Sequence, residues 1–301
     1  MEDGVCQLAG FTFSSNFDSG NLAHVELAGG GSDTDTDSEA GRVPHTARPT
    51  TSTATTRAVG TDCPDYEFQL WTRPDCQGTE FENGNRTWFY FGLRGGQPGA
   101  ILKFTVQNMN KQYKLFSQGM APVFMVPGRS GWERVRDLPT YSTQENNFTM
   151  SFKFRHLEEP NSQVYFAFSY PFTYKELQAN LGRLEKKHST AGLGWAELQE
   201  LPATATYFHR ELAIRSLEQR RLDLLTITSL AGLQPQREPC PANLFPDSSL
   251  AQPRPHKFAG KPVVFLSARV HPGETCSSYV IAGFIKVDFM FISKCDVKLN
   301  N

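Results

Sequence analysis

The feature that most constrains the fold of this chain is an apolar run that leads into a histidine and a glutamate three positions apart. Residues 261–270 read Lys-Pro-Val-Val-Phe-Leu-Ser-Ala-Arg-Val, and His271-Pro272-Gly273-Glu274 follows. A nearly continuous apolar run is typical of a strand buried on both faces in an α/β sheet. Such sheets place their sites at the carboxyl ends of strands. We therefore predict a buried strand over 261–270 that delivers His271 to a functional site.

The pair His271 and Glu274 predicts half of a zinc site. Zinc binds imidazole and carboxylate groups, and a catalytic zinc commonly has three protein ligands and one water. The Pro272-Gly273 dipeptide turns the backbone, so the two side chains are expected to converge. Hydroxyl residues that can cap a following helix come next: Thr275, Ser277 and Ser278.

The remaining histidines and the cysteine next to this motif do not predict a second catalytic or metal site. None of the six other histidines is predicted as the third ligand: His24, His45, His156, His188, His209 and His256. Cys276 has no indicated histidine partner that could activate it as a nucleophile, so we expect a small buried thiol there.

Composition limits the possible partners and the compartment. The 301 residues carry a formal net charge of -1, whereas binding to nucleic acid or membranes normally requires a clustered basic excess. The six cysteines show no paired spacing, which indicates free thiols in a reducing compartment. Residues 1–10 carry no secretory signal pattern. We expect a cytosolic protein with no nucleic-acid and no membrane partner.

The first part of the chain, residues 1–170, is predicted to be an antiparallel β-sandwich with an insert. Residues 28–62 are rich in Gly, Ser, Thr and Asp, so they are predicted to be disordered. Short aromatic and β-branched segments separated by turn residues then predict strands. These segments are Tyr66 to Thr72, Thr87 to Leu93, Ile101 to Gln107, Phe148 to Phe154 and Val164 to Tyr170.

The second part, residues 171–301, begins where the apolar period changes from two to that of a helix. Thr173 and Glu176 form a capping-box pattern ahead of leucines at helical spacing. The segments 211–217 and 221–228 flank a polar turn and predict a hairpin. A Pro-rich stretch over 234–255 predicts a surface loop. The overall prediction is therefore an α+β protein of two domains.

Four separated motifs make the chain resemble a known family. They are Phe17-Asp18-Ser19-Gly20-Asn21-Leu22, the run Glu82-Asn83-Gly84-Asn85-Arg86-Thr87-Trp88-Phe89-Tyr90-Phe91, Ser117-Gln118-Gly119-Met120 and His271-Pro272-Gly273-Glu274-Thr275. Together they are similar to the cytosolic carboxypeptidases, from about Phe11 to about Phe284.

The resemblance implies a fold, a cofactor and an activity. The fold is an amino-terminal β-sandwich followed by an α/β zinc-carboxypeptidase domain with a mixed sheet. The cofactor is Zn²⁺, with His271 and Glu274 as ligands. The implied activity is removal of glutamates, including the branch-point glutamate, from polyglutamylated tubulin tails. The implied partners are tubulin and microtubules, and the implied location is the cytoplasm and cytoskeleton, with a nuclear pool allowed.

The resemblance ends at about residue 284. The family continues with a further zinc histidine, groups that hold the substrate carboxylates and a catalytic glutamate, whereas residues 285–301 of this chain follow a different pattern. We therefore expect a chain truncated within the catalytic domain, with no catalytic residue of its own, and a partial domain of low stability. The alternative function is an inert product whose β-sandwich binds tubulin or another partner.

Overall fold

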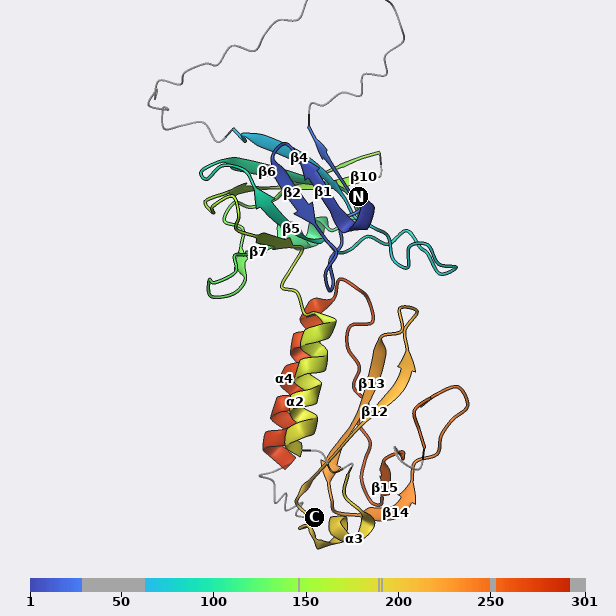
Figure 1. Ribbon diagram of the computed structural model, residues 1–301. Coiled ribbons are helices and arrows are strands. Elements are labelled where there is room, and N and C mark those ends of the chain that lie inside the picture. Colours follow the sequence, from blue (N-terminus) through green and yellow to red (C-terminus); the bar gives the residue numbers. More distant parts are fainter. Residues whose placement is uncertain (29–62, 146, 189, 191, 250–252, 293–301) are drawn as a thin grey trace, which may run out of the picture. The chain divides into compact units, whose positions relative to one another are not determined.

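The computed structural model describes residues 1–28, 63–145, 147–188, 190, 192–249 and 253–292 (Figure 1). The chain divides into two compact units, Met1–Pro171 and Phe172–Asn301. Except for Ala28, the predicted insert over 28–62 lies outside the described residues. Among the helices in these ranges, none has both the length and the apolar character needed to cross a membrane.

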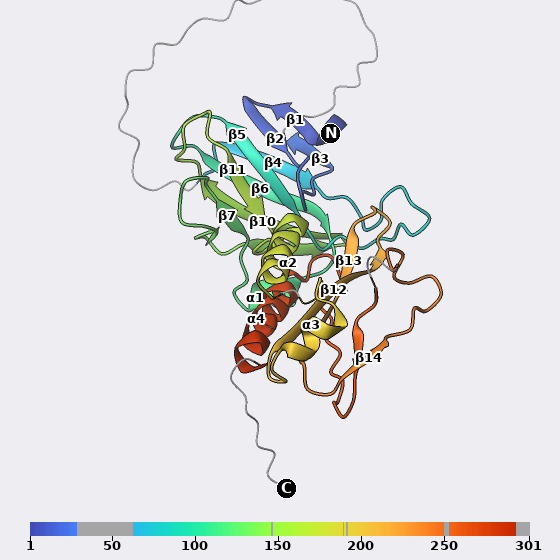
Figure 2. The ribbon, with the colours of Figure 1, turned by 60° about the horizontal axis from the view of Figure 1, so that its bottom comes forward.

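The first unit contains two sheets (Figures 1 and 2). The six-stranded sheet has the order β1, β2, β5, β11, β7, β8, with bounds Val5–Leu8, Phe11–Ser14, Tyr90–Gly95, Val164–Ala167, Val123–Met125 and Glu133–Arg134. The five-stranded sheet has the order β3, β4, β6, β10, β9, with bounds His24–Leu27, Tyr66–Trp71, Ile101–Met109, Asn147–Arg155 and Thr140–Gln144. The described residues of this unit also form a 3₁₀ turn, Glu2–Gly4, and a short helix α1, Tyr113–Ser117.

The five segments predicted as strands from their aromatic and β-branched residues are strands β4, β5, β6, β10 and β11. In β10 the alternation predicted from the sequence is confirmed. Phe148, Met150, Phe152 and Phe154 are buried, and the residues between them are partly exposed. Successive side chains of a strand point to opposite faces, so this pattern puts one face of the sheet on the core.

The two sheets face each other across a core of aromatic rings. Phe13 of the six-stranded sheet lies 5.0 Å from Phe68 of the five-stranded sheet, measured between ring centroids. Phe104 lies 5.6 Å from Phe91 and 5.1 Å from Phe166 in the same way. Edge-to-face and tilted contacts at these separations stabilise the core beyond the burial of apolar area alone.

One strand pair corrects the prediction that the first unit is antiparallel throughout. β4 pairs with β6 in parallel, with Phe68 opposite Phe104. Parallel neighbours require a crossover connection. Here the chain between β4 and β6 passes through β5, which belongs to the other sheet. The chain therefore runs through β6 in the same direction as through β4. A series of short strand segments in the sequence does not reveal this parallel pairing.

The described residues of the second unit form three helices and two antiparallel strand pairs. Their bounds are α2 Tyr174–His188, α3 Trp195–Glu200, β12 Thr206–Arg215, β13 Arg221–Ser229, β14 Leu233–Arg237, β15 His256–Phe258 and α4 Thr275–Ile292. The predicted capping box is confirmed, because Thr173 N donates to Glu176 Oε2 at 2.7 Å and Glu176 N donates to Thr173 Oγ1 at 3.2 Å. The predicted hairpin is β12 and β13. The predicted loop over 234–255 contains most of β14.

The predicted strand over 261–270 is wrong, and with it the mixed sheet expected for the second unit. These residues have no helix or strand structure, and the strands described in the unit form only antiparallel pairs. Val263, Val264 and Phe265 are 92%, 77% and 77% exposed. A strand needs a neighbour for its backbone groups, and the described residues supply none beside this segment.

Because the two sheets share one aromatic core, shortening a buried aromatic side chain there should strongly lower the stability of the first unit. Phe104 is fully buried and contacts rings of both sheets. Phe104→Ala should lower the free energy of unfolding by about 3–5 kcal/mol, measured by urea denaturation. The matched control is Phe81→Ala, because Phe81 is 54% exposed, and it should change stability by less than about 0.5 kcal/mol. Equal effects of the two substitutions would contradict this description of the core.

Candidate metal centre

The predicted ligands His271 and Glu274 lie at the two ends of a tight turn just before α4. Glu274 N donates to His271 O at 3.2 Å, which closes a four-residue turn over Pro272 and Gly273. Proline at the second position and glycine at the third are favoured in such turns, because proline presets φ and glycine tolerates unusual backbone angles. The sequence therefore dictates a local geometry that brings the first and fourth side chains together.

The two side chains meet directly. His271 Nδ1 donates a hydrogen bond to Glu274 Oε1 at 2.8 Å, and both side chains are exposed, at 71% and 52%. This hydrogen bond is the main reason that the pKa of the Glu274 carboxyl lies below its usual value. The carboxyl is therefore ionised at neutral pH, which is the form that binds a metal.

Arg269 supports the turn and was not identified from the sequence. Its guanidinium donates to Pro272 O from Nε at 3.3 Å and from Nη2 at 3.2 Å, and Nη1 donates to Phe172 O. Its backbone N–H donates to Ser277 Oγ at 2.9 Å, and its φ is 58°. A non-glycine residue with this φ is uncommon. Arg269 thus connects the turn to the start of α2 and to the first turn of α4, and nothing in the apolar pattern marks it.

The donors fit zinc in chemistry but not in number. At zinc bond lengths of about 2.0–2.1 Å, two tetrahedral ligand atoms are separated by about 3.3 Å. Because both side chains are exposed, Nδ1 and Oε1 can move apart from 2.8 Å without disturbing a packed core. However, no group of three or more histidine, cysteine, aspartate or glutamate side chains is arranged for a metal within the described part of the chain. His271 and Glu274 would therefore supply two of the three protein ligands that a catalytic zinc commonly has.

The remaining candidate residues lie elsewhere. His24 pairs with Glu26 at 2.9 Å on an exposed strand. His156, His209 and His256 are buried, His188 ends α2, and His45 lies outside the described residues. The prediction that Cys276 is buried is wrong, because its side chain is exposed near the start of α4.

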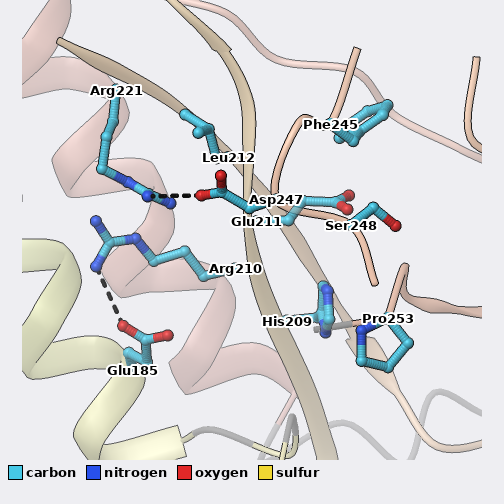
Figure 3. Close-up of a pocket in the computed structure, with 10 residues that line it drawn as sticks. All are labelled: Glu185, His209, Arg210, Glu211, Leu212, Arg221, Phe245, Asp247, Ser248 and Pro253. Carbon is cyan, nitrogen blue, oxygen red and sulfur yellow. Dashed lines mark hydrogen bonds and ion pairs between the residues drawn. The ribbon is translucent and has the colours of Figure 1, made fainter. Parts of the chain in front are cut away.

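A second polar cluster lies in the second unit, around a hollow of about 390 Å³ (Figure 3). Arg210 of β12 bridges α2 and β13, with Nη1 3.1 Å from Glu185 and Nη2 3.0 Å from Asp223. Arg221 donates to Asp223 from Nε at 3.0 Å. Although burial opposes ionisation of Asp223, the hydrogen bonds from Arg210 and Gln178 lower its pKa. The ion pairs of this cluster therefore hold α2 against the β12–β13 hairpin.

His209 and Glu211 occupy the opposite face of β12 from Arg210, since side chains alternate along a strand. Glu211 Oε2 lies 2.9 Å from Arg254 Nε. His209 is 6% exposed. Its pKa is lowered to about 4, chiefly by burial and then by the positive charges of Arg237 and Arg254. His209 is therefore neutral at physiological pH and serves the packing of the unit.

The buried His209 predicts a defined pH dependence of stability. Its pKa of about 4 in the folded state lies below the 6.5 of a solvent-exposed histidine, so the unfolded state binds the proton first as the pH falls. Stability is therefore fully present above pH 6.5 and is lost between 6.5 and about 4, by up to about 3 kcal/mol. Urea unfolding of the wild type and of His209→Gln over this range measures the effect.

In this comparison His209→Gln should flatten the pH dependence between 6.5 and 4. The control is His24→Gln, which changes an exposed histidine and should retain the wild-type slope. A wild-type slope in His209→Gln would show that His209 does not carry the effect.

The chain is similar to curated proteins over nearly its whole length. It is 49% identical to cytosolic carboxypeptidase-like protein 5 of Homo sapiens over 281 residues, 92% of this chain and 29% of that protein. The corresponding values for Danio rerio are 46%, 91% and 28%, and cytosolic carboxypeptidase 6 of Mus musculus is 33% identical over 75% of the chain. The chain thus spans less than a third of the length of the first of these relatives.

A family model and solved structures also match. Residues 53–169 match the cytosolic carboxypeptidase N-terminal domain. A putative carboxypeptidase A from Shewanella denitrificans aligns with a TM-score of 0.39 and 16% identity, over 72% of this chain and 39% of the other. A metallo-carboxypeptidase from Pseudomonas aeruginosa aligns with a TM-score of 0.37 and 18% identity, over 71% and 39%.

Proposed function

The chain belongs to the cytosolic carboxypeptidase family, and on that premise we propose that its function is zinc-dependent removal of glutamates from proteins. The proposed substrates are the polyglutamylated tails of tubulin, including the branch-point glutamate. The observation that carries the proposal is the 2.8 Å pair of His271 and Glu274. This pair combines an imidazole with an ionised carboxylate on a turn of four residues, which is the donor set that zinc prefers.

Each residue of the turn has a role in this proposal. His271 and Glu274 supply two zinc ligands, and Arg269 is a positioning residue that holds the carbonyl of Pro272 and so fixes the turn. Bound zinc would acidify a water molecule and polarise the scissile carbonyl. The proposed location is the cytoplasm, on microtubules, and a nuclear pool is compatible with the same substrate.

A second function is favoured by a specific observation: the described residues place two metal ligands together rather than three. In this alternative the chain is catalytically inert, and the first unit, Met1–Pro171, binds tubulin or another protein. A two-ligand site holds zinc weakly, since affinity depends on a complete and preorganised ligand set. The two functions differ in whether glutamate is released.

The test uses the full 301-residue chain with polyglutamylated tubulin and added zinc, and measures free glutamate. The enzyme proposal predicts release that a chelator removes and that His271→Ala reduces by at least roughly 100-fold, because a metal ligand is lost. His24→Ala is the matched control. It also removes an exposed histidine that pairs with a glutamate, at 2.9 Å, and should leave the rate unchanged.

Glutamate release that is absent with zinc present would overturn the enzyme proposal for this chain. Co-sedimentation with microtubules in the same samples separates the remaining cases. Binding without release supports the inert interaction module, and absence of both contradicts that alternative as well.

A further inference from the structure

Ser277, in the first turn of α4, connects the chain before the His271–Glu274 turn to the residue that ends this turn. Its hydroxyl donates to Glu274 O at 2.7 Å and accepts the backbone N–H of Arg269 at 2.9 Å. The Ser277 N–H also donates to Glu274 O, at 3.2 Å. The Glu274 carbonyl therefore receives two donors from one residue, and the same hydroxyl holds the chain on the other side of the turn.

These contacts hold the backbone from which the Glu274 carboxylate projects. Glu274 N donates to His271 O at 3.2 Å. The carboxylate folds back over the turn, with Oε1 2.8 Å from His271 Nδ1 and Oε2 3.4 Å from His271 N. Because both ligand side chains are exposed, packing does little to fix their directions. Hydrogen bonds behind a ligand then determine how well it is oriented.

The contact between Ser277 and Arg269 is not explained by helix formation. A serine in the first turn of a helix can donate to the carbonyl three residues earlier without any other segment. The Arg269 N–H, however, lies eight positions earlier and outside α4, and Arg269 has a φ of 58°. Residues other than glycine rarely adopt this φ. The Ser277 hydroxyl therefore stabilises a backbone conformation that is unfavourable by itself.

We propose that Ser277 is a positioning residue for the Glu274 carboxylate: its hydroxyl ties Glu274 to Arg269 and so directs the carboxylate toward His271. This inference rests on the proposed function, in which His271 and Glu274 bind zinc. The Arg269 guanidinium holds the middle of the same turn through Pro272 O, and Ser277 completes the support at its end. Residues that orient a metal ligand typically raise metal affinity by about 10- to 100-fold.

Zinc affinity of the full 301-residue chain, measured by competition with a chromophoric chelator, tests the proposal. Ser277→Ala should weaken zinc binding by at least about tenfold. Ser277→Thr retains the hydroxyl and should restore the wild-type affinity. The matched control is Ser216→Ala, because the Ser216 hydroxyl also accepts a backbone N–H, that of Arg220 at 3.2 Å, in the hairpin turn. This control should bind zinc as the wild type does, and equal losses in the two Ser277 variants would overturn the proposal.

Amide hydrogen exchange of the metal-free chain separates this proposal from the proposed function. Ser277→Ala should speed exchange of the Arg269 and Glu274 amides by about fivefold, the effect of one hydrogen bond, and Ser277→Thr should not. If the wild type binds no zinc while these amides still respond, zinc binding fails and the positioning role of Ser277 stands. Unchanged exchange of both amides in Ser277→Ala would overturn the positioning role, whatever the zinc affinity.

Discussion

A β-strand is stable only when a neighbour satisfies its backbone groups and covers its apolar side chains. The first unit meets this requirement with two sheets whose aromatic side chains pack across one core. The second unit does not meet it for residues 263–268, although their sequence is that of an interior strand.

Charge replaces apolar burial in much of the second unit. Its buried apolar cluster is small and is formed by Leu198, Tyr207 and Leu230. Arg210 of β12 pairs with Glu185 of α2, whose side chain is 41% exposed, and with the buried Asp223 of β13. Such pairs offset the cost of removing charges from water only when both partners are present. The unit is therefore sensitive to pH and to single charge changes, whereas the first unit is sensitive to lost volume in its core.

Local sequence patterns predicted the structure well where the interactions are local. The alternation in β10, the Thr173–Glu176 capping box and the His271–Glu274 turn depend on residues a few positions apart. The parallel β4–β6 pair depends on the path of the chain between sheets, which no short pattern records. Short strands such as β1 to β3 have too few residues to reveal a period.

The prediction for residues 261–270 failed for a related reason. An apolar run indicates that a segment needs neighbouring strands and a covering layer. It does not indicate whether the described chain supplies them. Arg269 was missed because its role depends on two distant acceptors, the Phe172 carbonyl and the Ser277 hydroxyl, together with an unusual φ. The turn that brings His271 and Glu274 together could thus be predicted from the sequence, whereas its support by Arg269 could not.

Backbone hydrogen exchange of the 301-residue chain measures whether residues 263–268 lack a strand partner, as they do among the described residues. Without a partner, the Val263 to Ala268 amides should exchange within about tenfold of an unstructured peptide, while the amides of Phe104 and Phe152 exchange only through global unfolding. Protection of the Val263 to Ala268 amides equal to that of Phe104 would contradict this, because the segment would then be paired inside its own unit.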